Sequence, residues 1–229
     1  MTHPLVLDQD NGLWVSTDSG LLLLNRDTGG VMARFGVSNS WRCLSEALPW
    51  KGGALVVVER ASGRCALMYV DKSRGVLDET PLPPLRRARL YGTSNGEVWL
   101  VGSTASAVDA LTETDRVLVF TRDVQGHLTG RFTLPGDRSI DGTLGSDGSL
   151  WLSTYTGDEE ERGALYLLNR EGALLLQWSP PSPSGVAAPL LLNETTIQVT
   201  TSNGLACLKL EQTEQQAELL PNDAAGARL

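Results

Sequence analysis

One unit of sequence occurs five times along this chain of 229 residues, and this repetition restricts the folds that the chain can adopt. The first copy is DQDNGLWVSTDSGLLLLNRDTGG, residues 8–30, and clear relatives begin at residues 94 and 146. Looser copies are KGGALVVVERASGRCALMYVDKSRG, residues 51–75, and NETTIQVTTSNGLACLKLEQT, residues 193–213. The period is about 45 residues. Aligned on the tryptophan of the first copy, the units place at one position Trp14, Val56, Trp99, Trp151 and Gln198.

Each copy has the pattern of β-strands joined by tight turns. Dipeptides such as Asn11-Gly12 and Asp147-Gly148 accept positive φ in a hairpin, and an apolar run follows each one. A second run, LLLLN in the first copy, is almost continuously apolar, which is typical of a strand buried on both faces. A glycine-closed turn and a further run follow, and an apolar stretch precedes each unit. We therefore expect four antiparallel strands per unit, named A to D in chain order.

Five such units predict an all-β fold, a single β-propeller domain of five four-stranded blades stacked around a channel. The expected blades span approximately residues 3–36, 41–83, 86–135, 139–180 and 186–221. The repeats are in phase with the ends of the chain, because PLVL lies at strand A of the first unit and AELLP at strand D of the last. Ring closure would then depend on packing between the first and last blades. The alternatives are a closed monomer and an incomplete ring that dimerises.

Two known repeat families share these motifs. DNGLWVSTDSGLLLLNRDTG and DGSLWLSTYTG, with GALYLLNREG after it, resemble the two-component-regulator propeller repeat, in which a DG turn leads to an LW(V/I)xT strand. The same units, followed by TGGVMARF and EGALLLQW, are similar to the quinoprotein-like repeat. The resemblance covers nearly the whole chain and implies a propeller fold. It implies no cofactor, because propellers of both kinds differ widely in activity and nothing here marks a quinone site.

Charge, hydropathy and cysteine content bear on the expected partners and compartment. The formal net charge of −8 opposes attraction to nucleic acid and to anionic membrane surfaces, and we expect neither as a partner. No stretch reaches the roughly 18 apolar residues of a membrane span. The three cysteines, Cys43, Cys65 and Cys207, form no metal or disulfide pattern and are expected to be small buried apolar residues. With no signal-peptide pattern at residues 1–12, the chain is expected to be cytoplasmic.

Binding residues are expected where the repeat breaks, because long loops carry function more often than short ones. In a propeller the D–A and B–C loops share one face, and the B–C loops at residues 103–115 and 154–162 are long. Trp14, Trp99 and Trp151 are expected to pack between blades, whereas Trp178 interrupts the pattern. The candidate contacts on the loop-rich face are an arginine loop, an acidic loop and one tryptophan: Arg86, Arg87, Arg89, Asp158, Glu159, Glu160, Glu161 and Trp178.

Catalytic groups are scarce. The two histidines, His3 and His127, have no nucleophile beside them in the repeat, and DQDNG lacks the ligand spacing of a calcium loop. Asp137, Asp141 and Asn193 lie near strand A and could approach the channel axis, as the ligands of gluconolactonase-like propellers do, but no spacing motif assembles them into a metal site. The sequence therefore favours a non-enzymatic scaffold that binds a protein partner, without a cofactor. The alternative is a small-molecule site at the channel mouth, as in a lactonase- or lyase-like enzyme or a sugar-binding module.

Overall fold

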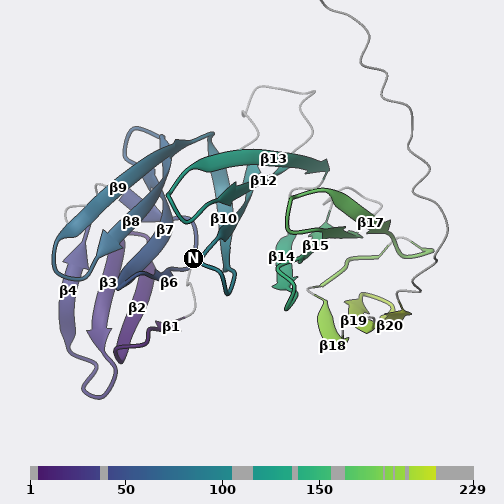
Figure 1. Cartoon of the computed structure of the whole chain (residues 1–229), viewed down its shortest axis with the longest axis horizontal. Helices are drawn as coiled ribbons and strands as arrows, with labels where there is room; N and C mark the ends of the chain where they lie inside the picture. The colour runs from purple at the N-terminus through teal and green to yellow at the C-terminus, as the bar shows by residue number, and fades with distance from the viewer. Residues whose placement is uncertain are drawn as a thin grey trace, which may run out of the picture.

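The computed structural model describes residues 5–36, 41–104, 116–135, 139–155, 163–182, 184–187, 189–193 and 196–209, and these residues form antiparallel sheets joined by turns. Each sheet is one blade, and the blades follow one another along an arc (Figure 1). Blade 1 contains β1 (Val6–Leu7), β2 (Gly12–Thr17), β3 (Gly20–Asn25) and β4 (Val31–Phe35). Blade 2 contains β5 (Trp41–Cys43), β6 (Leu48–Trp50), β7 (Gly53–Arg60), β8 (Cys65–Asp71) and β9 (Gly75–Leu82).

Blade 2 has a fifth strand because both β5 and β6 pair with β7, whereas the strands of blades 3, 4 and 5 pair in chain order. Blade 3 contains β10 (Leu85–Gly92), β11 (Val98–Thr104), β12 (Arg116–Arg122) and β13 (Leu128–Pro135). Blade 4 contains β14 (Ser139–Leu144), β15 (Leu150–Tyr155), β16 (Gly163–Leu168) and β17 (Leu174–Trp178). Blade 5 contains β18 (Leu190–Asn193), β19 (Thr196–Thr201) and β20 (Gly204–Lys209). Its expected fourth strand, AELLP at residues 217–221, lies outside the described residues.

Successive blades pack face to face through apolar cores, which confirms the propeller arrangement. A core lies between each pair of neighbouring blades from blade 1 to blade 5. Trp14, Trp99 and Trp151 are buried in three of these cores, at 0%, 2% and 4% exposure, so their expected packing role is confirmed. Each of these tryptophans faces the blade that follows its own.

The structure shifts the alignment of the second copy of the repeat by one residue, from Val56 to Leu55. The turn between β6 and β7 has only two residues between the pair Trp50 and Gly53, whereas the equivalent turn of blade 3 has three between Thr93 and Glu97. This shorter turn moves Leu55, not Val56, to the tryptophan position. Leu55 accordingly packs toward blade 3 and Val56 back toward blade 1. At the same position in blade 5 stands Gln198, as expected.

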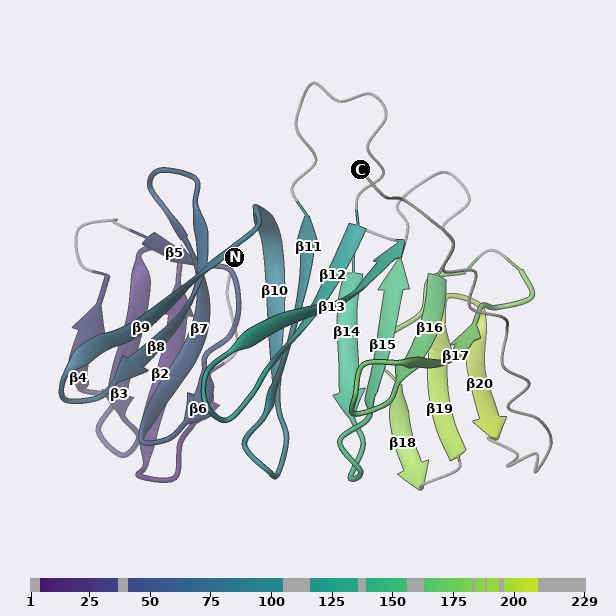
Figure 2. The same ribbon diagram turned by 45° about the horizontal axis from the view of Figure 1, so that its top comes forward.

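The arc is open within the described residues. No apolar core among them joins blade 5 to blade 1, and the two blades lie at opposite ends of the arc in both views (Figures 1 and 2). One face of blade 1 and one face of blade 5 therefore have no neighbouring blade in the described structure. The described residues form no helix that is long and apolar enough to cross a membrane.

The exposure of each cysteine depends on its place in its blade. Cys43 and Cys65 are buried free thiols, as expected, and burial raises the pKa of Cys43 to about 11. Cys207 is exposed, so its expected burial was wrong. It lies on β20 opposite Gln198, on the uncovered face of the last blade.

Candidate functional site

The three candidate arginines lie in a strand and not in a loop, which corrects the sequence interpretation. Arg86, Arg87 and Arg89 belong to β10, the innermost strand of blade 3. Its register with β11 shifts between Leu85 and Arg87, so the extra residue forms a β-bulge. A bulge interrupts the alternation of side chains, and here Arg86 and Arg87 are both exposed although they are consecutive.

The bulge fixes where this pair of arginines lies. Arg87 pairs with Ser103 at the end of β11, next to the long B–C loop of residues 105–115. The pair is thus held on sheet backbone at the loop-rich end of the inner strand. Arginine in such a position can form paired hydrogen bonds with a carboxylate or stack on an aromatic ring, with little loss of backbone entropy on binding.

Arg89 links three blades on the inner side of the arc. Its guanidinium pairs with Glu46, from the segment before β6, and its Nη2 lies 3.1 Å from Asp141 Oδ1 on β14. Both carboxylates therefore already share one cation. Beside them, burial raises the pKa of the Tyr91 hydroxyl, which lies against the backbone of Gly142 on β14. The inner strands of blades 2, 3 and 4 are in this way joined by charge and by packing.

A channel metal site, which the sequence did not favour, would have to use Asp137, Asp141 and Asn193. Asp141 is engaged by Arg89, Asn193 lies at the end of β18, and Asp137 lies outside the described residues. In the described part of the chain, no three His, Cys, Asp or Glu side chains are grouped to hold a metal ion. A carboxylate pair neutralised by arginine is a weak ligand set for a divalent cation.

Of the remaining candidate contacts, the structure describes Trp178 alone. Trp178 ends β17 opposite Leu165 and packs against the core between blades 4 and 5, so part of its ring is structural. The acidic run at residues 158–161 lies outside the described residues. Arg86 and Arg87 are thus the members of the predicted set that the structure describes as exposed on the inner strand.

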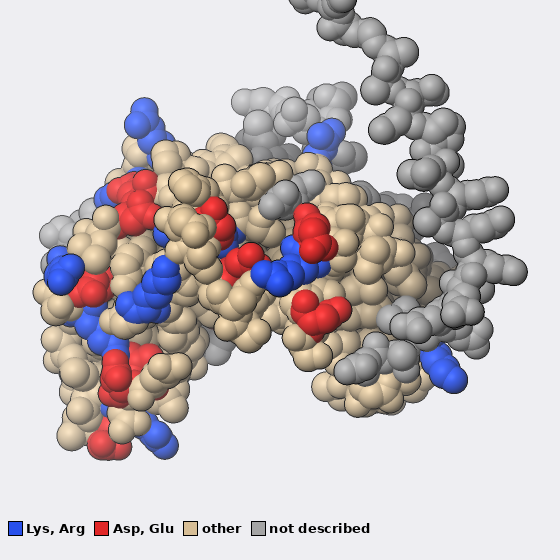
Figure 3. Space-filling model, viewed as in Figure 1, with Lys and Arg blue, Asp and Glu red and all other residues tan. Residues whose placement is uncertain are grey.

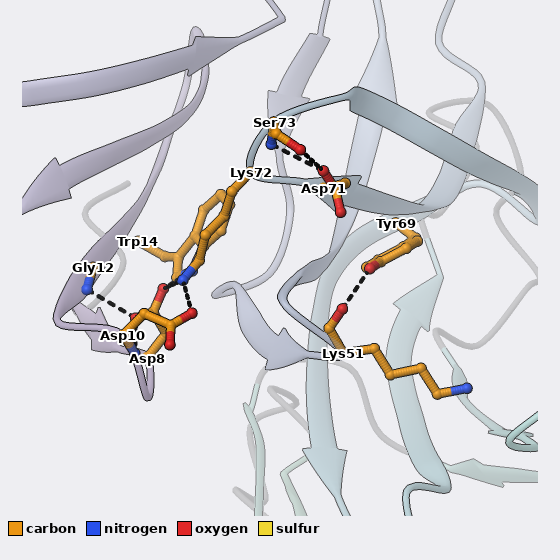
Figure 4. Close-up of polar contacts among 9 residues, drawn as sticks. All are labelled: Asp8, Asp10, Gly12, Trp14, Lys51, Tyr69, Asp71, Lys72 and Ser73. Carbon is orange, nitrogen blue, oxygen red and sulfur yellow. Dashed lines mark hydrogen bonds and ion pairs between the residues drawn. The ribbon is translucent and has the colours of Figure 1, made fainter.

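At the opposite end of the strands, the A–B turns are tied to the next blade by polar contacts. The carboxylate of Asp8 accepts hydrogen bonds from the backbone N–H of Gly12 at 2.8 Å and from Trp14 Nε1 at 3.0 Å (Figure 4). Lys72, from the β8–β9 turn of blade 2, lies 2.8 Å from Asp8 and 2.7 Å from Asp10. Burial alone would raise the pKa of Asp8, but the hydrogen bonds from Lys72 and from the backbone outweigh it and lower that pKa.

Similar contacts join the later blades. Arg170 of blade 4 pairs with Glu97 of blade 3 at 3.1 Å, and Trp99 Nε1 donates to the carbonyl of Gly148. Lys51 of blade 2 donates to the carbonyl of Val124 in blade 3. Cations and anions are interspersed over the view of Figure 3, and no single sign of charge dominates it. The polar groups of these turns thus hold neighbouring blades together.

Comparison with known proteins settles the fold. No family model and no curated protein matches the sequence. Solved structures do: regucalcin from Agrobacterium tumefaciens, described as a calcium-binding protein, has 14% identity and a TM-score of 0.51 over 86% of this chain and 66% of its own. A puromycin-hydrolyzing peptidase from Mycobacterium tuberculosis has 13% identity and a TM-score of 0.57, covering 91% and 37%. The fold is a β-propeller.

A third solved structure is also longer than this chain. Hsv2p from Kluyveromyces lactis has 9% identity and a TM-score of 0.55 over 91% of this chain and 61% of its own. The chain therefore spans at most about two thirds of the length of each of these structures. At such identities the likeness concerns the fold and carries no activity to this chain.

Proposed function

We propose that this protein is a non-enzymatic propeller scaffold that binds a protein partner through the loop-rich end of its inner strands, centred on Arg86 and Arg87. The observation that carries the proposal is the β-bulge at Arg86, which exposes two consecutive arginines on a rigid strand. Bulges recur where a side chain is re-aimed toward a site. Arginine is also enriched among the residues that dominate protein interfaces.

The chemistry of the surface defines the partner. Two consecutive exposed arginines favour a partner segment with carboxylates, and the net charge of the whole chain, −8, makes this basic pair stand out. Neighbouring loops would complete the contact, with the acidic run at residues 158–161 and the exposed part of Trp178 as further candidates. Arg89, held by Glu46 and Asp141, positions the strand.

Three further proposals rest on the sequence. The repeats are of the two-component-regulator or quinoprotein-like type, on the motifs quoted above. The protein works in the cytoplasm, which agrees with the buried thiols of Cys43 and Cys65, neither of which forms a disulfide in the described structure. A small-molecule or lactonase-like site at the channel mouth is the competing function, and the engagement of Asp141 by Arg89 speaks against it.

Affinity capture from the native host tests the scaffold. The wild-type chain and the control Arg74→Glu/Lys209→Glu, which changes two exposed cations at the opposite end of the strands by the same charge, are expected to retain the same protein, in a salt-sensitive manner. Arg86→Glu/Arg87→Glu is expected to lose it. Equal retention by all three chains, or a melting-temperature rise of several degrees with calcium, a sugar or a lactone, would overturn the proposal.

A further inference from the structure

Blade 1 has an apolar face that no described residue of another blade covers. Along β2 and β3, side chains alternate between the core shared with blade 2 and the opposite face of the sheet. The opposite face is as rich in large apolar side chains as the covered one, and several are far more exposed than core residues, Leu7 at 47% and Val31 at 47%. By their pairing, the apolar members of this blade 1 face are Leu7, Leu13, Val15, Leu22, Leu24 and Val31, with Arg34 beside Leu22.

At the edge of this face lies a cation at the position from which other blades form an ion pair with the preceding blade. In blades 2 and 4 the residue after the first Asp or Asn of the C–D turn is a cation, Lys72 or Arg170, which pairs with an acid in the A–B turn of the blade before. The same position in blade 1 is Arg26. Arg26 is exposed and makes a long contact of 3.4 Å with Asn11 of its own blade.

The other end of the arc does not match this face. The uncovered face of blade 5 has leucines at its edges, Leu190 and Leu205, but its central strand presents Thr196, Gln198 and Thr200. Burying the Gln198 amide against leucines would leave its hydrogen-bonding groups without partners. A polar central strand is typical of a terminal repeat that faces water.

We propose that the blade 1 face binds the blade 1 face of a second copy, forming a two-fold dimer. An axis parallel to the strands places the A–B turn of one copy opposite the C–D turn of the other. Asp10 pairs with Lys72 of its own chain, but its side chain is still 73% exposed. In the dimer it also faces Arg26 of the second copy, and this contact forms twice. The contact thus repeats between chains the turn-to-turn pairing seen between blades, and it is self-complementary, so it stops at two copies.

The area of the blade 1 face sets the expected affinity of the dimer. The strands β2, β3 and β4 lie about 4.8 Å apart and are about 17 Å long, and with the two-residue β1 beside them they give a footprint of roughly 300 Å² per copy. Side-chain relief enlarges the accessible area, but the contact stays at the lower end of specific interfaces. We therefore expect a dissociation constant on the order of micromolar. This contact is separate from the Arg86 and Arg87 surface, so the two proposals stand or fall independently.

Sedimentation velocity of the full chain from about 1 to 100 μM tests the dimer. We expect a monomer–dimer equilibrium for the wild type and a monomer throughout for Leu22→Asp, whose fold is checked by circular dichroism and melting temperature. The matched control Leu205→Asp places the same charge on the blade 5 face and is expected to dimerise like the wild type. A wild type that stays monomeric at 100 μM would refute the proposal, as would dissociation by Leu205→Asp but not by Leu22→Asp.

A charge exchange tests the two-fold axis. Arg26→Asp is expected to weaken the dimer about tenfold or more, and adding Asp10→Arg to it is expected to recover most of the affinity, because the pair is then reversed in both places. If Arg26→Asp leaves the affinity unchanged, or if the double change is no better than the single one, the copies do not meet in this orientation.

Discussion

The ammonium of Lys72 lies 2.8 Å from the carboxylate of Asp8, whose side chain is only 5% exposed, and this pair joins blade 2 to blade 1. Asp8 also accepts the Trp14 indole N–H, so one carboxylate orients both the neighbouring blade and the tryptophan between them. We expect Asp8→Asn to lower the free energy of unfolding by about 2 kcal/mol, because a buried ion pair loses one partner. Urea denaturation measures this, with Asp10→Asn as a control expected to change it by less than about 0.5 kcal/mol.

The same pair predicts a pH dependence. The pKa of Asp8 is lower in the folded chain than the ordinary 3.8, so its ionised form stabilises the fold. That contribution is complete above the ordinary pKa and is lost as the pH falls through the folded-state value. The difference in unfolding free energy between the wild type and Asp8→Asn should therefore shrink on acidification below 3.8. A difference that grows toward low pH would show that Asp8 is not held as the anion.

Arg89 should contribute a salt-sensitive part of the stability. Its side chain is 41% exposed, so solvent and ions screen its pairs with Glu46 and Asp141. We expect Arg89→Met to cost about 1 kcal/mol at low salt and less in 1 M sodium chloride. Arg89→Lys should recover less than half, because one ammonium cannot span both carboxylates as a guanidinium does. Full recovery by lysine would mean that the bridging geometry is unimportant.

Substitution at the tryptophan position of the repeat should lower the free energy of unfolding strongly between two blades and only slightly in blade 5, at the end of the arc. Trp99→Ala removes a side chain that is 2% exposed and should lower the free energy of unfolding by about 3–5 kcal/mol. Gln198→Ala should change it by no more than about 0.5 kcal/mol, because no described blade covers that residue. Chemical denaturation of both variants compares them. A large loss for Gln198→Ala would indicate that another part of the molecule packs on blade 5.

Thiol reactivity should separate the three cysteines. Cys43 and Cys65 are buried, and burial raises the pKa of both, whereas Cys207 is exposed. We expect a thiol reagent such as Ellman's to modify Cys207 rapidly in the native chain and the other two only after unfolding. Cys207→Ser should abolish the rapid phase. Rapid modification of Cys43 in that variant would contradict the packing of blade 1 on blade 2.

The strands and their turns could be predicted from the sequence because the signals are local. Apolar runs set the strands, and Asn11 and Gly148 indeed have positive φ, at 61° and 85°. The register of blade 2 was missed because Gly52-Gly53 can be aligned with the other turns in two ways. The structure resolves this through a turn that is one residue shorter, which brings Leu55 rather than Val56 to the tryptophan position.

The candidate site could be predicted from the sequence only in part. Arg86 and Arg87 come shortly after Pro83 and Pro84, and two adjacent polar residues break the alternation of a strand, so the sequence predicts a loop here. Only a β-bulge allows both to be exposed within β10, and bulges depend on pairing with a distant strand. The uncovered face of blade 1 was equally hidden, because LLLL in β3 predicts burial on both sides, whereas the structure covers one.

The openness of the arc is tested most directly by the separation of its two end faces. Spin labels on native Cys207 and on Leu22→Cys mark the faces of blades 5 and 1, while the buried Cys43 and Cys65 are protected from labelling. Diluting the labelled chain in excess unlabelled wild type removes coupling between copies. We predict no short-range dipolar broadening, with a separation well beyond the roughly 10 Å between packed sheets. Strong broadening in the diluted sample would show that blades 1 and 5 pack together and that the ring is closed.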